Sequence, residues 1–336
     1  MPEGHTVHRL ARALDELFGG EALAVSSPQG RFADGAALLD GRRLAGAEAW
    51  GKQLFCAFVP AGETAPAADD VRWLRVHLGL YGAWTFAGDP SAGSRSRVVH
   101  AIGAPRRRIG ERESTPDGRD VVPDGAPWTP PAPRGAVRLR LAAPHAVADL
   151  TGPTACEVLT APEKAAVEAR LGPDPIRPDG GRASPEAARA AFVDRVRRSR
   201  VTVGQQLMDQ AVIAGVGNIY RAEALFRAGV DPLRPGRDVP EAALAAIWDD
   251  LVVLMRDGAS VGAIVTTRPE HRVPDGGQAT ARRTRQNTDG EAGAVPADEA
   301  FYVYHRDGLP CRVCGAPVLT KELAGRNLFW CGVCQT

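Results

Sequence analysis

The sequence predicts an α+β protein, in which a helix-led β-sandwich precedes a helical domain and a small cysteine-bearing module. Three observations support this fold class. Residues 5–18 place their apolar side chains on one face of a helix. Residues 52–59, 71–80 and 137–141 are short apolar runs, several of them alternating, as is typical of strands. Helical periodicity then replaces this pattern beyond residue 184.

Each predicted element has its own local signal. The first helix ends where Gly19-Gly20 interrupts the pattern. Ser184-Pro185 is a good N-cap and first-turn pair, and it opens a helix to about Arg198. Further helices are expected to begin at Thr202, Asn218 and Pro240, the last extending to about Met255. Residues 103–135 and 274–300 have no core-forming pattern, so we expect long loops there.

Composition excludes some classes of protein. The chain has 336 residues, which is enough for two domains and a small appendage. No apolar run is long enough for a signal peptide or a membrane span. The formal net charge of +1 leaves nucleic-acid binding open, because only local patches can indicate it. Four of the six cysteines fall in the last 26 residues, which favours a metal site in a reducing compartment. We therefore expect a cytoplasmic protein without a membrane partner.

The strongest local motif is the cysteine pattern near the C-terminus. Its members are Cys311, Cys314, Cys331 and Cys334, in the spacing CxxC…CxxC with 16 residues between the pairs. Two such pairs on facing turns make a tetrahedral zinc site, and four protein ligands leave no position for a catalytic water. The pattern predicts one structural zinc ion. Arg326 precedes Cys331 by five residues, and on spacing alone it reads as a solvated surface arginine.

A second motif spans residues 204–227. Two helical segments flank a glycine-bearing turn, and Asn218 is the expected cap of the second helix. Backbone amides at such a helix start suit a DNA phosphate, although a plain helical hairpin explains the same residues. Positive charge lies just upstream, at Arg189, Arg195, Arg197, Arg198 and Arg200.

A third signal is the position of Pro2-Glu3 directly after the initiator methionine. Removal of Met1 would expose a secondary amine, which can attack a sugar C1′ and form an iminium. An α-amine titrates near pH 8, so more of it is free base at neutral pH than of a lysine. Glu3 could handle the protons of such a reaction. Taken alone, however, a Met-Pro start is more often without catalytic meaning.

These motifs together resemble the formamidopyrimidine-DNA glycosylase / endonuclease VIII family. The matching segments are PEGHTVHRLARAL, GKQLF, HLGLYG, the block 206–226 and the terminal CxxC…RNLFWCxxCQ, in the expected order from residue 2 to residue 335. Within the family the chain is most similar to actinobacterial Nei-type enzymes. The resemblance implies a catalytic β-sandwich domain over 1–152, a helical domain over 153–300 with a helix–two-turn–helix at about 202–229, and a zinc finger over 301–336.

The resemblance also implies a role for each matching residue. Pro2 would be the Schiff-base nucleophile and Glu3 the essential acid/base. Lys52 would assist base loss and β-elimination, although a strand-end lysine is the plain alternative. Asn218 would bind a DNA phosphate. Arg326 would bind phosphate and assist δ-elimination. The resemblance therefore favours a functional role for Arg326, where spacing alone favoured a solvated surface arginine.

Leu80-Tyr81 would match the wedge that fills the space left by a flipped base. An apolar and an aromatic side chain can offset part of the cost of unstacking. Leu80 also continues the alternation of Leu74, Val76 and Leu78, so a core position stays open. The flanking glycines favour an exposed hairpin tip.

Three departures from the oxidised-guanine branch of the family bear on the substrate. Ala211 stands where that branch has lysine, and Leu150-Thr151-Gly152-Pro153 stands where it has an Arg and Phe pair as further wedges. The polar stretch 274–300 replaces its capping loop. His5-Thr6, where many relatives have a second acid, and Gly79 also depart from common patterns. We expect a bifunctional DNA glycosylase/AP lyase that acts as a monomer on oxidised pyrimidines in damaged DNA. An oxidised-guanine glycosylase and a non-catalytic zinc-ribbon DNA-binding protein are the alternatives.

Overall fold

A computed structural model describes residues 2–63, 67–89, 101–103, 128–272, 294–296 and 298–336. The predicted loops at 103–135 and 274–300 lie largely outside these described residues. The chain divides into two compact units: the first comprises residues 1–2 and 6–169, the second residues 3–5 and 170–336. Among the described residues, no helix has both the length and the apolar character needed to cross a bilayer.

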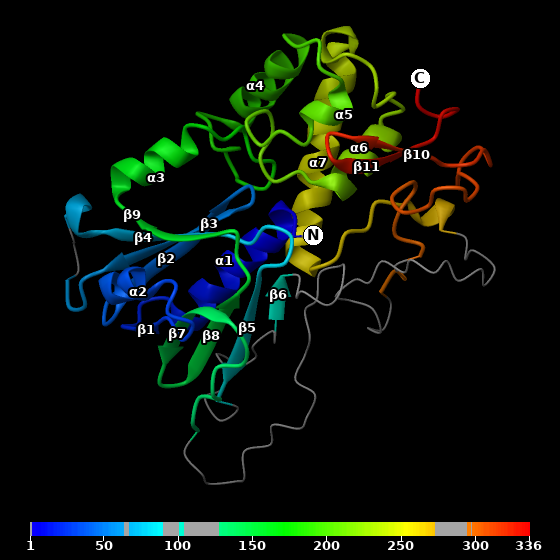
Figure 1. The fold of residues 1–336 in the computed structure, drawn as a ribbon. Coiled ribbons are helices and arrows are strands. Elements are labelled where there is room, and N and C mark those ends of the chain that lie inside the picture. Colours follow the sequence, from blue (N-terminus) through cyan, green and yellow to red (C-terminus); the bar gives the residue numbers. More distant parts are fainter. Residues whose placement is uncertain (1, 64–66, 90–100, 104–127, 273–293, 297) are drawn as a thin grey trace. The chain divides into compact units, whose positions relative to one another are not determined.

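The first unit is a β-sandwich with a helix in its core (Figure 1). One sheet is antiparallel in the order β2 (Arg43–Trp50), β3 (Gln53–Val59), β4 (Arg72–His77), β9 (Ala155–Leu159). The other has the order β1 (Ala24–Ser26), β7 (Val137–Ala143), β8 (Ala146–Thr151), β5 (Ala83–Gly88), β6 (Ala101–Gly103). The short helices α2 (Ala33–Leu39) and η1 (Ala68–Asp70) connect strands.

Helix α1 (Gly4–Phe18) follows the amphipathic pattern of its sequence. Leu10, Leu14 and Phe18 recur at helical spacing and are fully buried in the core cluster that both sheets share. Gly20 has a φ of +84°, which ends the helix at the predicted glycine pair. The prediction of a helix over 5–18 is confirmed to within one residue.

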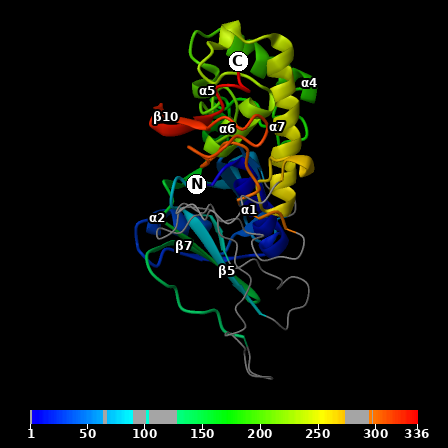
Figure 2. The ribbon, with the colours of Figure 1, turned by 90° about the vertical axis from the view of Figure 1, so that its right-hand side faces the viewer.

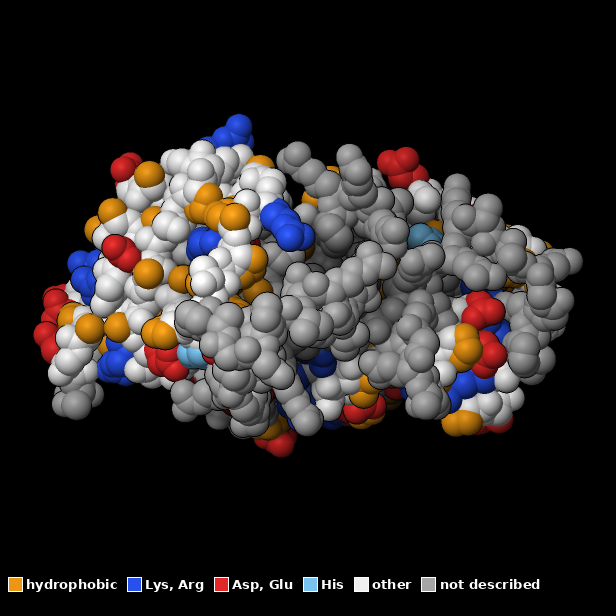
Figure 3. Space-filling model, turned by 90° about the horizontal axis from the view of Figure 1, so that it is seen from below, with side chains coloured by type: hydrophobic (Ala, Val, Ile, Leu, Met, Phe, Trp, Pro, Cys, Tyr) orange, Lys and Arg blue, Asp and Glu red, His pale blue; other side chains and the backbone are white. Residues whose placement is uncertain are grey.

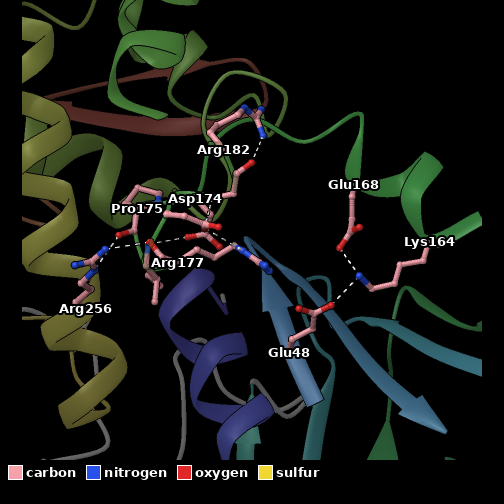
Figure 4. Close-up of polar contacts among 11 residues, drawn as sticks. Glu48, Lys164, Glu168, Asp174, Pro175, Arg177, Arg182 and Arg256 are labelled. Atoms are coloured by element: carbon pink, nitrogen blue, oxygen red, sulfur yellow. Dashed lines mark hydrogen bonds and ion pairs between the residues drawn. The ribbon is translucent and has the colours of Figure 1, made fainter. Parts of the chain in front are cut away.

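Helix α3 (Ala161–Glu168) is fixed by a lysine on the outer face of the four-stranded sheet. The Lys164 ammonium lies 4.4 Å from the Trp73 ring centroid and forms ion pairs with Glu48 at 2.7 Å and with Glu168 at 2.5 Å (Figure 4). Because β9 also pairs with β4, residues 153–169 lie with the sandwich. The sequence placed them in the helical domain, so in the structure the division falls near residue 169 instead of 152.

The second unit is helical and ends in a two-stranded hairpin (Figure 2). Its elements are α4 (Pro185–Arg197), α5 (Val203–Gln206), α6 (Asn218–Arg227), η3 (Gly236–Asp238), α7 (Glu241–Val261), η4 (Pro269–His271), β10 (Leu319–Leu323) and β11 (Arg326–Trp330). The Ser184 hydroxyl accepts a hydrogen bond from the Ala187 N–H at 3.2 Å, which confirms the predicted cap. Thr202 opens only a single helical turn, and α7 continues beyond Met255 to Val261.

The loop before α4 is held by arginines of the same unit (Figure 4). Arg256 of α7 donates to the carbonyl oxygens of Pro175 at 3.1 Å and Arg177 at 3.0 Å. Arg182 donates to the Leu171 carbonyl at 2.9 Å. These bonds satisfy backbone acceptors that no helix or strand would pair, so the loop has a defined path into α4.

Candidate functional site

Glu3 is buried at the start of α6. One carboxylate oxygen accepts the N–H of Ile219 at 2.8 Å, and the other accepts the N–H groups of Gly217 at 2.9 Å and Tyr220 at 3.4 Å. The first N–H groups of a helix have no partner within it and attract negative charge. Glu3 therefore acts as a cap supplied from the N-terminus of the chain.

Gly217 makes this approach possible. A Cβ at this position would lie 2.4 Å from the Glu3 Cδ, which is well inside van der Waals contact. Any side chain there would therefore displace the carboxylate. The nearby turn is also fixed by Gln210, whose Oε1 accepts the Gly215 N–H at 2.9 Å and whose Nε2 donates to the Val216 carbonyl at 3.0 Å.

Asn218 does not cap α6, and this corrects the expectation from the sequence. Gly217 is the N-cap residue and makes no side-chain cap, while Asn218 is the first residue of the helix. Three of the amides that the sequence offered to a phosphate are occupied by Glu3. The Asn218 side chain instead donates to the Asn327 carbonyl of β11 at 3.0 Å.

Arg221 belongs to the same cluster, and sequence reasoning missed it. It follows Asn218 by three residues, so both lie on one face of α6. Its side chain is fully buried; Nη2 donates to the Asn218 Oδ1 and, at 3.2 Å, to the Asn327 carbonyl. The pKa of Arg221 is lowered to about 10, chiefly by burial; the Glu3 carboxylate acts to raise it, and the Arg326 cation acts to lower it. The only available sequence signal was a basic residue one turn after Asn218.

The four cysteines predicted to bind zinc lie together. Their sulfur atoms are all within 4.8 Å of one another. The Sγ–Sγ distances are 3.9 Å for Cys311 and Cys334 and 3.5 Å for Cys314 and Cys331. A tetrahedral site with Zn–S bonds of about 2.3 Å has S–S edges of roughly 3.8 Å. The four thiolates therefore fit one zinc ion without an open coordination position, in agreement with a structural role.

Arg326 is exposed and begins β11, directly after the turn at Ala324-Gly325. Both turn residues have positive φ, +53° and +71°, which produces the tight hairpin. Strand β11 packs against α6. The structure thus brings the Asn327 backbone carbonyl to the side chains of Asn218 and Arg221.

Lys52 lies in the turn between β2 and β3 of the first unit, and it is half-buried. His77, at the end of β4, is its electrostatic neighbour: burial lowers the pKa of His77, and the cations of Lys52 and Arg75 lower it further. Arg75 in turn donates to Gln53 at 3.0 Å and pairs with Glu157 at 2.5 Å. The sequence identified only Lys52 as a candidate site residue. His77 was not singled out, because its place in an alternating segment predicts no more than one face of a strand.

Leu80 and Tyr81 lie in the turn between β4 and β5, where they are 39% and 52% exposed. Leu74, Val76 and Leu78 are buried, so the alternation stops before Leu80. Exposure, and not a core position, is therefore the correct alternative for Leu80. The turn is not a hairpin, however, because β4 and β5 belong to different sheets. Gly79, with a φ of +67°, reverses the chain at this point.

The arginines upstream of the turn are less available than the sequence suggested. Three of them form ion pairs within the second unit: Arg189 with Asp249 at 2.8 Å, Arg197 with Glu241 at 2.7 Å, and Arg198 with Asp194 at 3.7 Å. Charges of both signs are also interspersed over the coloured part of the face in Figure 3.

This arrangement of sandwich, helix–two-turn–helix and cysteine finger defines a known class. The chain matches three family models: the formamidopyrimidine-DNA glycosylase N-terminal domain over residues 1–115, its H2TH domain over 171–269, and the zinc finger found in FPG and IleRS over 308–336. The chain belongs to the formamidopyrimidine-DNA glycosylase/endonuclease VIII family. It is 43% identical to Endonuclease 8 1 of Mycobacterium tuberculosis over the full length of both chains.

Solved structures show the same fold. A complex of Lactococcus lactis Fpg with DNA containing an abasic site has a TM-score of 0.63 at 17% identity and covers 99% of both chains. The MutM (FPG) protein of Thermus thermophilus has a TM-score of 0.61 at 24% identity, covering 99% of this chain and 98% of its own. The predicted fold class, a β-sandwich followed by a helical domain and a zinc finger, is confirmed.

Proposed function

We propose that the protein is an endonuclease VIII-type DNA glycosylase and AP lyase of base excision repair, which uses Pro2 as its nucleophile. The observation that carries the proposal is the Glu3 carboxylate, held by backbone amides of the helix–two-turn–helix directly beside Pro2 in the chain. A DNA-binding protein without catalysis has no need of a carboxylate so fixed next to an N-terminal amine. The full-length similarity to a protein named Endonuclease 8 1 points the same way.

The chemistry follows from the residue types. After removal of Met1, the Pro2 nitrogen is a secondary amine that attacks C1′ of the damaged nucleotide, and the base departs. The C1′–O4′ bond of the sugar then opens, with a proton delivered to O4′, which leaves an iminium between C1′ and the Pro2 nitrogen. The resulting iminium acidifies the C2′ proton, so elimination of the 3′ phosphate becomes possible. Glu3, whose carboxylate is held by three backbone N–H groups, is the acid/base that handles the protons of these steps. Lys52 assists base loss, and Arg326 assists the second elimination.

Asn218 and Arg326 are the proposed phosphate ligands, and Leu80-Tyr81 the proposed wedge. Arg326, Leu80 and Tyr81 are exposed, which suits contact with DNA. Asn218 is nearly buried, but its amide nitrogen has two hydrogens and uses one on the Asn327 carbonyl. The second can reach a phosphate oxygen. The protein would act on damaged DNA as a monomer, with its one zinc ion shaping the finger.

Trapping with borohydride tests the proposal. Reduction during turnover on an oligonucleotide with one oxidised pyrimidine should give a covalent protein–DNA adduct, and peptide mapping should locate it at residue 2. A protein with a blocked N-terminus is the control and should give none. An adduct on Lys52, or strong binding with no adduct at all, would refute the assignment; the second result would favour a non-catalytic DNA-binding protein.

Oxidised pyrimidines are the proposed substrates. Ala211 and Leu150-Thr151 stand where the oxidised-guanine branch has other residues, and ring-saturated pyrimidines stack poorly and flip at low cost. Single-turnover excision of thymine glycol should be at least about tenfold faster than that of 8-oxoguanine opposite cytosine, since an ill-fitting base loses roughly 1–3 kcal/mol. Equal rates would favour the oxidised-guanine alternative and leave the Pro2 chemistry untouched.

A further inference from the structure

Arg221 is a buried cation that the protein only partly satisfies. The side chain has no exposed surface, yet its Nε and Nη1 atoms have no hydrogen-bond partner among the residues the structure describes. Its hydrogen bonds within this part of the chain come from Nη2, to the Asn218 Oδ1 and the Asn327 carbonyl. A guanidinium has five N–H donors, and burying a charge without full pairing is costly. An anion brought close to this cluster would compensate the charge.

The hydrogen bond to Asn218 sets the orientation of its amide. Because Arg221 donates to Oδ1, the Nδ2 group of Asn218 must point the other way, where it donates to the Asn327 carbonyl at 3.0 Å. An amide is nearly symmetric in shape, so without a donor at Oδ1 it could turn over and present an acceptor to a phosphate. Arg221 therefore selects the orientation in which Asn218 is a donor.

The charges around Arg221 leave an excess of positive charge. Glu3 is the carboxylate that favours the charged guanidinium, but its oxygens already accept three backbone N–H groups. The positive charge of Arg326, on the neighbouring strand β11, repels the positive charge of Arg221. Two mutually repelling guanidinium groups on the adjacent elements α6 and β11, one of them bonded to the Asn218 amide, have the chemistry of a phosphate site.

We propose that Arg221 is the positioning residue of this phosphate site: it holds Asn218 as a donor and, with Arg326, provides a pair of cations that a DNA backbone phosphate neutralises. The proposal rests on the function proposed above and adds a residue that acts from beneath the surface. Arg221 stabilises the bound state more than the free protein, because a bound phosphate adds to the partial compensation that Glu3 supplies.

A thermodynamic cycle tests this proposal: it combines substitution of Arg221 in the protein with replacement of one DNA phosphate by a neutral group. Binding of the full-length protein is measured with DNA containing a tetrahydrofuran abasic analogue, in which one flanking phosphate at a time is replaced by an uncharged methylphosphonate. For the wild type, one such replacement should weaken binding about tenfold or more, as expected for loss of a charged hydrogen bond. Arg221→Met should weaken binding to normal DNA by a similar factor, yet be almost insensitive to that same replacement.

Matched variants separate positioning from general damage. Arg326→Ala should couple to the same phosphate, whereas Arg31→Met, at an exposed arginine of the first unit, should couple to none. Arg221→Lys keeps the charge but cannot reach both acceptors, so its binding should be intermediate. The melting temperature of Arg221→Met without DNA should equal or exceed that of the wild type, because an incompletely paired buried charge is removed.

Equal weakening at every phosphate position together with a lower melting temperature would show that Arg221 is only structural, and would overturn the proposal. Unchanged affinity in Arg221→Met would overturn it too. Binding to the analogue needs no Pro2 chemistry, so failed borohydride trapping refutes the proposed catalysis without touching this site. A wild-type protein that does not bind the analogue would refute both.

Discussion

The carboxylate of Glu3 accepts a hydrogen bond from the backbone N–H of Ile219 at 2.8 Å, across 216 positions of sequence. This hydrogen bond attaches Glu3, the acid next to the proposed nucleophile Pro2, to the helix–two-turn–helix. The start of α6 attracts the negative charge of the carboxylate. The carboxylate in turn accepts hydrogen bonds from backbone N–H groups that have no partner within the helix. Glu3 and Asn218, the residues proposed for acid/base catalysis and for phosphate binding, are thus connected through one helix terminus.

Glu3→Gln should abolish most base excision. Glutamine replaces one acceptor oxygen by a donor that faces backbone N–H groups, and each lost charged hydrogen bond costs about 1.5–3 kcal/mol. We expect excision to fall at least about 100-fold in single-turnover assays, while binding to a tetrahydrofuran analogue changes far less. Glu16→Gln, at an exposed position of α1, is the control. Wild-type excision by Glu3→Gln would contradict the assigned role.

Arg326→Ala should separate the two eliminations. If the guanidinium holds the phosphate that departs last, its removal shifts products on a pre-formed abasic site from δ- toward β-elimination. Affinity should fall about tenfold, or roughly 1.4 kcal/mol. Lys321→Ala, at an exposed site of the same hairpin, should leave products and affinity unchanged. An unaltered product ratio in Arg326→Ala would reduce the residue to a phosphate anchor.

Cys331→Ser should release the zinc ion. A structural zinc supplies on the order of 10 kcal/mol to a small finger, so the hairpin that carries Arg326 and Asn327 should lose its fold. Metal analysis should show less than one zinc per chain, and affinity for the abasic analogue should drop. Cys156→Ser, in the first unit, should retain both. Full zinc content with normal binding in Cys331→Ser would disprove the ligand set.

His77 should make stability depend on pH. Burial, with the cations of Lys52 and Arg75, lowers the pKa of His77 in the folded state, so the unfolded chain binds this proton more readily. Its contribution is fully present above the unfolded pKa of about 6.5 and is lost as pH falls through the folded value. Urea unfolding should show that the wild type loses more stability than His77→Gln between pH 7.5 and pH 5. Parallel curves would contradict this.

Much of the fold follows from local patterns. The helix over α1, the cap at Ser184 and the tetrad of cysteines were all predicted, because each depends on residues close in sequence. Glycine spacing around Leu80 and Tyr81 likewise indicated an exposed tip. The placement of residues 153–169 was not predictable in this way, since it depends on pairing between β9 and the distant β4.

The sequence by itself determined the metal ligands, the order of the domains and the family, since short-range spacing and matching motifs encode these. Only the tertiary structure decided which groups occupy the start of α6. Glu3 takes amides that the sequence offered to a phosphate, and Arg221 proves to be buried beneath Asn218. Both outcomes depend on contacts more than 100 positions apart, with Glu3 and with Asn327, and no local pattern records which distant group satisfies a buried donor.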